Sequence, residues 1–228
     1  MTTLLIAIRN LCKSYIEGDR QRTIFTGLNL DLERGQFIAL LGQSGSGKST
    51  LLNLLGGIDR PDAGEIRIAD QTITALSEVE RSRFRRRQIG FVFQFFNLIP
   101  TLTVAENLLL PLELNGLATP EQCERALELL DNVGLGDRRD SFPERLSGGE
   151  QQRLAIARSV VHRPLLLLAD EPTGNLDAVT GGRILELLLT LHQQAGTTIV
   201  MVTHSQEVAA RADRLLRLDS GQIQEIAP

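Results

Sequence analysis

The sequence predicts an α/β fold, in which a mostly parallel core sheet carries a small antiparallel β subdomain and an inserted helical subdomain. A short apolar run, Gln36–Leu41, leads straight into a glycine-rich loop, as a buried strand of a parallel sheet does. Strand and helix patterns alternate around this loop, which is typical of parallel α/β sheets. Helical spacing dominates residues 102–163 instead, so we expect a helical insertion between two groups of strands.

The first hundred residues predict two groups of strands around a short helix. Thr50–Leu55 follows the glycine loop, is rich in Leu and stops at Gly56–Gly57, which marks a helix end. Ile89–Phe93 predicts another strand. Weaker alternation upstream predicts the strands of a smaller sheet: Leu4–Arg9, Thr23–Leu32 and Gly64–Ile68.

The rest of the chain predicts helices first and strands again at the end. The insertion has three segments with helical spacing: Val104–Leu114, Pro120–Asn132 and Gln151–Val161. Strand patterns return at Leu165–Leu168 and Thr198–Val202. Between them, apolar spacing at i, i+3, i+4 and i+7 predicts a helix through Leu185, Leu188, Leu189 and His192. We expect one domain over residues 1–228, with its core and β subdomain at about 1–101 and 164–228 and its helical subdomain at about 102–163.

The composition excludes several classes of protein. With 228 residues, of which 42% are hydrophobic, the chain can bury a core without disulfide or metal staples. Its net charge of −4 argues against a broad nucleic-acid surface. The cysteines, Cys12 and Cys123, are far apart and lack metal-binding spacing, which fits a reducing compartment. We find no secretory signal and no apolar stretch of the ~20 residues that span a bilayer, so any membrane crossing is expected from another chain.

Residues 42–49, GQSGSGKS, match the phosphate-loop pattern G-x-x-x-x-G-K-[ST] between a predicted strand and a predicted helix. Glycines let backbone N–H groups face phosphate oxygens, and Lys48 would neutralise the β- and γ-phosphates. Ser49 would ligate Mg²⁺ and Thr50 would hold the α/β region. A plain Gly/Ser loop with a solvated lysine is the disfavoured alternative. The nucleotide-binding residues expected here are Gly42, Gln43, Ser44, Gly45, Ser46, Gly47, Lys48, Ser49 and Thr50.

Residues 165–172, LLLLADEP, are an apolar run that ends in two carboxylates. At the end of a strand both can reach the mouth of a site. Asp170 would hold Mg²⁺, and Glu171 would orient and deprotonate an attacking water. A strand that merely ends in solvated acids is the alternative, and the glycine loop in the same chain disfavours it.

Residues 146–153, LSGGEQQR, form a second candidate anion site. A serine and two glycines precede a helical run, and the start of a helix attracts anions. One ATP needs only one phosphate cradle, and the glycine loop is already complete. Two copies arranged head to tail would sandwich each ATP between Lys48 of one copy and Ser147, Gly148 and Gly149 of the other. Taken alone, Ser-Gly-Gly is usually just a loop.

GQSGSGKST, LSGGEQQR, LLLLADEPTGNLD and a late VTH together resemble the ATP-binding cassette (ABC) family across nearly the whole chain. LLGGIDRPDAGEI and IGFVFQFFNLIPTLTVAENLLLPL, with ADEPTGNLD, resemble the ATPases of its lipoprotein-release, macrolide-export and cell-division transporter group. The resemblance implies a single P-loop NTPase domain of ABC type that hydrolyses ATP to ADP and phosphate. It also implies an ATP-dependent homodimer on the cytoplasmic face of the inner membrane, bound to a separate transmembrane permease and not to nucleic acid.

The resemblance also implies further site residues. Tyr15 falls where the family stacks an aromatic ring on adenine, and a core or surface tyrosine is the disfavoured alternative. Gln94 falls where the family's glutamine touches Mg²⁺ and the attacking water; alone, it would be a plain polar residue at a strand end. His204 would contact the γ-phosphate and orient Glu171, whereas a lone histidine after a strand is usually incidental.

The segment after Glu171 and the signature complete the set. Asn175, Leu176 and Asp177 would reach across the dimer, and Asp177 could also cap the following helix. Glu150 stands in the signature where many relatives have Gln, and Ser205 follows His204 where Asp is commoner. Neither departure puts hydrolysis in doubt. Glu150 is expected to lie at the nucleotide with Ser147, Gly148 and Gly149.

Two surface features bear on partners. Phe91–Leu102 is unusually apolar, and it is either buried or, with Phe95, Phe96 and Leu98 exposed, a docking groove for an apolar helix. Arg81–Arg87 holds five arginines. We favour a solvated helix face offset by Glu78 and Glu80 over contact with anionic lipid or an acidic partner loop.

The function that the sequence favours is that of the ATP-hydrolysing subunit of an ABC transporter, with the cargo left open. A soluble ABC ATPase of DNA repair or translation is the alternative, but the chain lacks inserted coiled coils, zinc-type cysteines and a second cassette. A small-molecule kinase would share the glycine loop but would have no role for LSGGEQQR.

Overall fold

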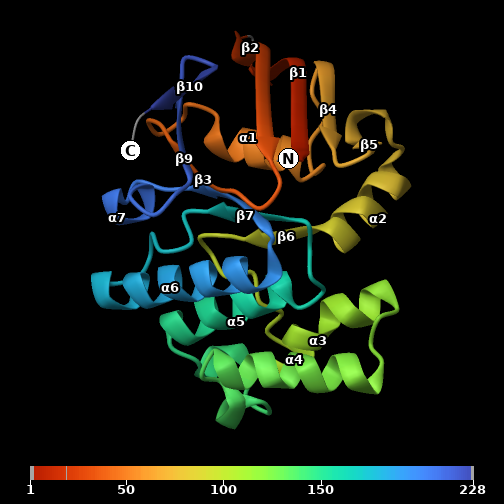
Figure 1. Ribbon diagram of the computed structural model, residues 1–228, viewed down its shortest axis with the longest axis vertical. Helices are drawn as coiled ribbons and strands as arrows, with labels where there is room; N and C mark the ends of the chain where they lie inside the picture. Colours follow the sequence, from red (N-terminus) through yellow and green to blue (C-terminus); the bar gives the residue numbers. More distant parts are fainter. Residues whose placement is uncertain (1–2, 19, 227–228) are drawn as a thin grey trace. The chain divides into compact units, whose positions relative to one another are not determined.

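The computed structural model describes residues 3–18 and 20–226, so the outermost residues of the expected domain, 1–2 and 227–228, lie outside the described residues. The chain divides into two compact units, Met1–Arg85 with Thr198–Pro228, and Arg86–Thr197 (Figure 1). The expected helical insertion, residues 102–163, falls inside the second unit. In the described part of the chain no helix is long and apolar enough to cross a membrane.

The first unit contains an antiparallel sheet with the strand order β2-β1-β4-β5. All three strands that the sequence predicts for this sheet are present, and the first two are longer than expected. The register of β1 shifts between Ile8 and Leu11, and Asn10 between them has a positive φ of 49°. Such a bulge breaks the period-two pattern, so the alternation read from the sequence stops at Arg9. The strands are β1 (Leu4–Glu17), β2 (Arg20–Glu33), β4 (Ala63–Ile68) and β5 (Gln71–Thr72).

The first unit also contains the strand that precedes the glycine loop. β3 (Phe37–Leu41) pairs in parallel with β8 (Thr198–Val202) and with β9 (Arg214–Asp219), and β10 (Gln222–Ile226) pairs antiparallel with β9. All five residues of β8 are buried, as a continuous apolar run in a parallel sheet predicts. The sequence reading did not anticipate β9, β10 or α7. The helical elements here are α1 (Lys48–Leu55), η1 (Ile73–Ala75), α7 (Gln206–Ala209) and α2 (Glu78–Gln88), within which the first unit ends.

The second unit pairs two parallel strands and packs four helices. β6 (Ile89–Val92) runs parallel to β7 (Leu166–Asp170). The helices α3, α4 and α5, coloured from yellow-green to blue-green in Figure 1, share one apolar core. Leu108, Leu130 and Leu154 contribute one fully buried side chain from each of these helices. The expected α/β class is therefore confirmed. The helices are α3 (Val104–Asn115), α4 (Pro120–Asn132), α5 (Gly148–Val160) and α6 (Ala178–Ala195), with short turns at η2 (Gly136–Arg138) and η3 (Pro143–Arg145).

The apolar segment Phe91–Leu102 is neither wholly buried nor free. Phe95 is 72% exposed, whereas Leu98 packs against the helical core. The fully buried Asn107 of α3 holds this segment, because its Oδ1 accepts from the Ile99 N–H at 2.8 Å and its Nδ2 donates to three carbonyls within 3.0 Å. Arg158 of α5 adds a hydrogen bond to the Phe96 carbonyl at 3.1 Å. The segment is thus fixed to α3 and α5.

Candidate functional site

The phosphate loop lies in the first unit between the end of β3 and the start of α1. Gly45 and Gly47 have φ values of 77° and 104°, which residues with a Cβ rarely adopt, and Gly47 caps the helix without a side-chain partner. The first backbone N–H groups of a helix have no partner within it, so they are available to an anion. The loop therefore has the backbone form that its glycines predict.

Lys48 is the first residue of α1 and bends back over the loop. It is 7% exposed, and its Nζ donates to the carbonyl oxygens of Gly42 and Gln43 at 2.8 and 2.9 Å. The buried Ser46 Oγ has no hydrogen-bond partner within the described part of the chain. A buried hydroxyl without a partner costs free energy, so this atom suits a loop that is completed by a ligand oxygen. These features fit a phosphate group.

Gly47→Ala should impair the loop. A Cβ at this position would lie 2.5 Å from Ile24 Cγ2 and 3.2 Å from Phe25 Cζ, and the positive φ adds strain. We expect ATP affinity to fall by at least about tenfold, because the N–H groups at the start of α1 lose their alignment. Titration calorimetry with ATP measures this. Gly196→Ala is the matched control, since Gly196 is also at positive φ but a Cβ there would meet no atom within 4 Å. Equal losses of ATP affinity in both variants would contradict the prediction.

Tyr15 lies on β1, directly opposite Arg22 of β2. Its hydroxyl donates to Asp59 Oδ2 at 2.7 Å, and the Lys13 Nζ lies 4.7 Å from its ring centroid. Burial raises the pKa of the Tyr15 phenol, and so does the hydrogen bond to Asp59, whereas the Thr50 side chain acts in the opposite direction. The predicted adenine-binding ring is thus a neutral donor beside the helix that follows the phosphate loop.

Three residues of the first unit were missed by the sequence reading. Lys13 and Asp59 contact Tyr15, and Arg22 donates from Nη2 to the Gly45 carbonyl of the phosphate loop at 2.8 Å. No motif marks them, since each acts through a partner that is distant in the sequence or on the neighbouring strand. The cross-strand pairing of Tyr15 with Arg22 would have been the only signal, and it depends on the register of the hairpin.

His204 also belongs to the first unit, where it is exposed two residues after the end of β8. Ser205, the residue that departs from the family pattern, caps α7 by accepting from the Val208 N–H. A serine performs this capping role as well as an aspartate does. The departure at Ser205 thus preserves the local structure next to His204.

The second unit brings Gln94, Glu171 and Asn175 together. Gln94 Nε2 donates to Asn175 Oδ1 at 3.2 Å, and Asn175 Nδ2 donates to the Gln94 carbonyl at 3.1 Å. A Cβ placed on Gly174 would meet both Glu171 Oε2 and Gln94 Nε2 within 3.4 Å. The predicted catalytic glutamate and glutamine therefore flank the same glycine.

β7 ends at Asp170, and Glu171 follows with a positive φ of 46°. This strained backbone conformation releases Glu171 from the alternation of the strand and is typical of functional positions. The fully buried Gln152 of α5 donates to the Pro172 carbonyl at 2.7 Å and so fixes the backbone directly after Glu171. Gln152 is part of the signature, but the sequence reading gave it no role.

The signature forms the start of α5. The helix was expected from Gln151, but it begins at Gly148, because Ser147 and Glu150 form a capping box. Ser147 Oγ and N–H both donate to Glu150 Oε2, at 2.6 and 2.8 Å. The Glu150 carboxylate thus faces back to Ser147. Hydrogen bonds from the Ser147 side chain and backbone lower the pKa of Glu150.

The segment after Asn175 lies against the signature glycines. A Cβ on Gly148 would meet Leu176 at 3.8 Å, and one on Gly149 would meet Thr180 at 2.7 Å. Asp177 caps α6 by accepting from the Thr180 N–H at 3.0 Å, and hydrogen bonds from Thr180 lower the pKa of Asp177. The capping role considered for Asp177 is therefore present.

The capping box at Glu150 makes stability depend on pH. Since its folded-state pKa is lowered, the ionised carboxylate contributes stability above the unfolded value of about 4.3, and this contribution is lost as pH falls through the folded-state pKa. We expect Glu150→Gln to reduce the loss of unfolding free energy between about pH 6 and pH 3, as measured by urea denaturation. Glu128→Gln, at an exposed position of α4, serves as control. An identical pH dependence in wild type and Glu150→Gln would contradict the prediction.

The predicted site residues are thus divided between the units. The first unit holds the phosphate loop, Tyr15 and His204, and the second holds the cluster at Gln94 and Glu171, together with Asp170, the signature and Asp177.

Comparison with known proteins identifies the family of the chain. A model of the ABC transporter family matches residues 25–174. An uncharacterized ABC transporter ATP-binding protein of Mycobacterium tuberculosis is 51% identical over 219 residues, which cover 96% of this chain and 88% of the relative. The lipoprotein-releasing system ATP-binding protein LolD of Xanthomonas oryzae pv. oryzae is 46% identical over 226 residues, covering 99% of this chain and 93% of LolD.

Solved structures match the chain over nearly its whole length. The ATP-binding cassette MJ0796, in a dimeric post-hydrolysis state bound to ADP and Pi, matches with a TM-score of 0.88 and 38% identity, covering 98% of this chain and 100% of that one. The resemblance read from the phosphate loop, the signature and LLLLADEPTGNLD is confirmed. This chain belongs to the ABC transporter family.

Proposed function

We propose that this chain is the ATP-binding and ATP-hydrolysing subunit of an ABC transporter, and that it works as an ATP-sandwich homodimer on a separate transmembrane permease. The observation that carries the proposal is that one chain holds both a phosphate loop and a capped signature helix start. Relatives that are ABC transporter ATP-binding proteins, and a dimeric cassette of the same fold, support it. They favour it over the alternative of an ATPase of DNA repair or translation.

The phosphate loop would bind the triphosphate of ATP. The N–H groups at the start of α1 would donate to phosphate oxygens, and Ser46 Oγ would gain a hydrogen-bond partner. Lys48 Nζ would turn from the Gly42 and Gln43 carbonyls to the β- and γ-phosphates. The residues that we assign to this task are Gly42, Gln43, Ser44, Gly45, Ser46, Gly47, Lys48, Ser49 and Thr50.

Mg²⁺ would be held by the Ser49 hydroxyl, the Asp170 carboxylate and the Gln94 side-chain amide. All three are hard oxygen donors, which Mg²⁺ prefers, so the donor set fits the ion. When bound, it supplies positive charge that offsets the negative charge on the γ-phosphate.

Glu171 would accept a proton from the attacking water. As the water oxygen bonds to the γ-phosphorus, the bond to the oxygen that bridges the β- and γ-phosphorus atoms breaks, and ADP leaves. Gln94, which Asn175 holds, would orient this water, and His204 would contact the γ-phosphate. Lys48 would offset the charge that develops on the phosphate oxygens.

The signature would act on the nucleotide of the other copy. Ser147, Gly148 and Gly149 would present the positive end of α5 to the γ-phosphate bound by the partner, with Glu150 fixing the first turn. Asp177 and its neighbours would meet the other copy at the same place. ATP would thus close the dimer and hydrolysis would reopen it. This cycle would shift the bound permease between two conformations.

The similarity to the lipoprotein-releasing protein LolD favours an export or lipoprotein-release permease as the partner. We place the subunit on the cytoplasmic face of the inner membrane, since the permease of such a system must be reached from the side that supplies ATP.

A pull-down tests this proposal. Tagged Glu171→Gln protein is bound to detergent-solubilised native membranes with ATP and Mg²⁺, and co-purified proteins are identified by mass spectrometry. We expect a stoichiometric polytopic membrane protein, and we expect it to be depleted when ATP is omitted. Recovery of only ribosomal or DNA-associated proteins would refute the transporter assignment.

A further inference from the structure

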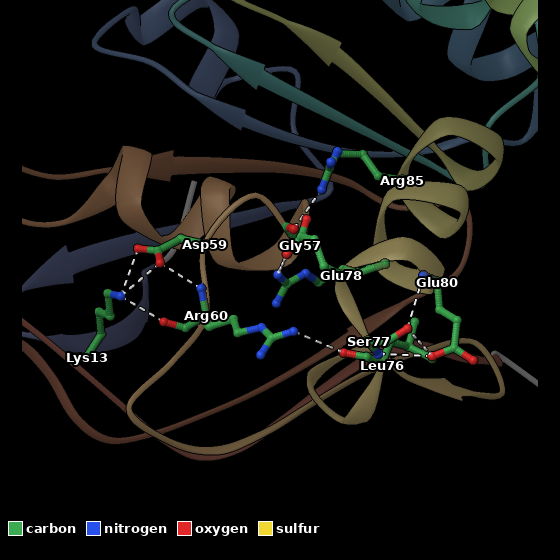
Figure 2. A network of polar contacts seen from close by, with 10 residues as sticks. Lys13, Gly57, Asp59, Arg60, Leu76, Ser77, Glu78, Glu80 and Arg85 are labelled. Atoms are coloured by element: carbon green, nitrogen blue, oxygen red, sulfur yellow. Dashed lines mark hydrogen bonds and ion pairs between the residues drawn. The ribbon is translucent and has the colours of Figure 1, made fainter.

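Three side chains of the first unit form one polar group, which we call the Tyr15 anchor: Lys13 and Tyr15 on β1, and Asp59 in the loop between α1 and β4. Lys13 Nζ donates to Asp59 Oδ1 at 2.9 Å and to the Arg60 carbonyl at 2.7 Å, as Figure 2 shows. The Tyr15 hydroxyl donates to Asp59 Oδ2 at 2.7 Å. Asp59 thus joins both β1 side chains.

The charges of the Tyr15 anchor are largely removed from water. The Lys13 side chain is 9% exposed and that of Asp59 is 30% exposed. Burial favours the neutral form of Asp59, but hydrogen bonds from Lys13, Tyr15 and the Arg60 N–H outweigh it and lower the pKa of Asp59. A buried charge with several partners has one favoured geometry, because each partner that is lost leaves a costly unpaired group.

The loop that carries Asp59 is held from its other side as well. Arg85 Nη1 of α2 donates to the Gly57 carbonyl at 2.7 Å, and Arg60 Nη2 lies 3.5 Å from the Leu76 carbonyl just before α2 (Figure 2). The position of Asp59 is therefore fixed by contacts of its loop that do not involve Tyr15. Within the anchor, Asp59 orients Tyr15 and not the reverse.

The anchor covers one face of the Tyr15 ring, and the residue is partly exposed. The Lys13 ammonium covers one face at 4.7 Å from the centroid, and Asp59 fixes the hydroxyl end. Tyr15 pairs across the hairpin with Arg22, whose Nη2 donates to the Gly45 carbonyl at 2.8 Å, so the ring lies near the phosphate loop. A flat base that belongs to a nucleotide on that loop can stack only on the uncovered face.

We propose that Asp59 and Lys13 are positioning residues for Tyr15, which hold its uncovered face toward the base of the bound nucleotide. The inference rests on the proposed function, because it presumes ATP on the phosphate loop. According to this inference, the Lys13–Asp59 ion pair, which lies outside the nucleotide-binding motifs, makes the protein bind ATP more tightly than a triphosphate without a base.

Binding of two probes tests the proposal. Wild type, Tyr15→Phe, Asp59→Asn and the double variant are titrated with ATP and with inorganic tripolyphosphate, each with Mg²⁺. Tyr15→Phe keeps the ring and leaves no buried charge unpaired, so this variant should fold. We expect each single variant to bind ATP about 3- to 10-fold more weakly and tripolyphosphate unchanged, because one hydrogen bond that orients the ring is lost. The double variant should be no weaker than the weaker single variant.

The outcomes separate the two proposals. Parallel losses for ATP and tripolyphosphate would mean that the anchor only maintains the fold, which overturns the inference. Wild-type ATP affinity in both single variants, with a loss in Tyr15→Ala, would show that the ring acts without its anchor and would also overturn it. A wild-type protein that binds neither probe would instead refute the proposed function. Arg9→Gln, which removes an exposed ion pair between Arg9 of β1 and Asp31 of β2, is the matched control.

Discussion

Glu171→Gln is expected to lower kcat for ATP hydrolysis by about 10²- to 10⁴-fold, while ATP binding is retained. The amide has the shape of the carboxylate but cannot accept the proton of the attacking water. The turn should survive the change, because the Gly174 N–H donates to the backbone carbonyl of residue 171 and Gln152 holds the Pro172 carbonyl. Single-turnover kinetics measure the loss of hydrolysis, and equilibrium titration with ATP measures whether binding is retained.

The same variant should accumulate as an ATP-bound dimer, because the step that reopens the dimer is blocked. Light scattering with saturating ATP and Mg²⁺ measures its mass against that of the nucleotide-free protein. Glu128→Gln, on the exposed side of α4, is the matched control and should turn over normally. A Glu171→Gln protein that stays monomeric would contradict the sandwich mechanism, and one that hydrolyses ATP at the wild-type rate would remove Glu171 from the role of base.

Lys48→Met is expected to weaken ATP binding by about 10- to 150-fold, the range for loss of hydrogen bonds to a charged group. The side chain is buried, and methionine preserves much of its stem. What is lost is the ammonium that the Gly42 and Gln43 carbonyls hold at the mouth of the loop. Those two carbonyls would then face the phosphates with no cation between them.

Titration calorimetry at two salt concentrations measures the loss. Arg83→Gln removes one positive charge from an exposed position of α2 and separates a local effect from a change in net charge. ATP affinity of the wild-type level in Lys48→Met, with the thermal stability also unchanged, would contradict the assignment of Lys48 to the phosphates.

The sequence predicted elements best where a pattern and its end signals agree. Pro120–Asn132 has both helical spacing and a Thr-Pro start, and the structure has a helix with the same bounds. The start of α5 was placed too late, because two glycines are poor helix formers and the capping box overrode that preference. β9 and β10 were missed: β10 has no fully buried residue, and β9 mixes buried leucines with charged residues.

The candidate site likewise contains residues that the sequence predicts and residues that it does not. Residues inside contiguous motifs could be assigned from spacing, since the chemistry lies within a few positions of chain. The partners of Tyr15 could not, because Lys13 and Asp59 are 46 positions apart and meet only through the packing of β1 against the loop after α1. The role of Gln152 was equally hidden, since its acceptor is the carbonyl of Pro172, 20 positions away.

Hydrogen bonds from Asn107 and Arg158 fix the segment after Gln94, and this affects how the segment can move. Asn107 binds Ile99 at both its N–H and its carbonyl, and Arg158 binds the Phe96 carbonyl, so the exposed Phe95 sits on backbone that cannot bend alone. We therefore expect a displacement of Phe95 to move α3 and α5, which hold the backbone on both sides of it. A Cβ on Gly148 would lie 3.8 Å from Phe96 Cζ, so the residue next to Phe95 lies beside the signature at the start of α5, and a displacement of Phe95 has a short path to the LSGGE serine.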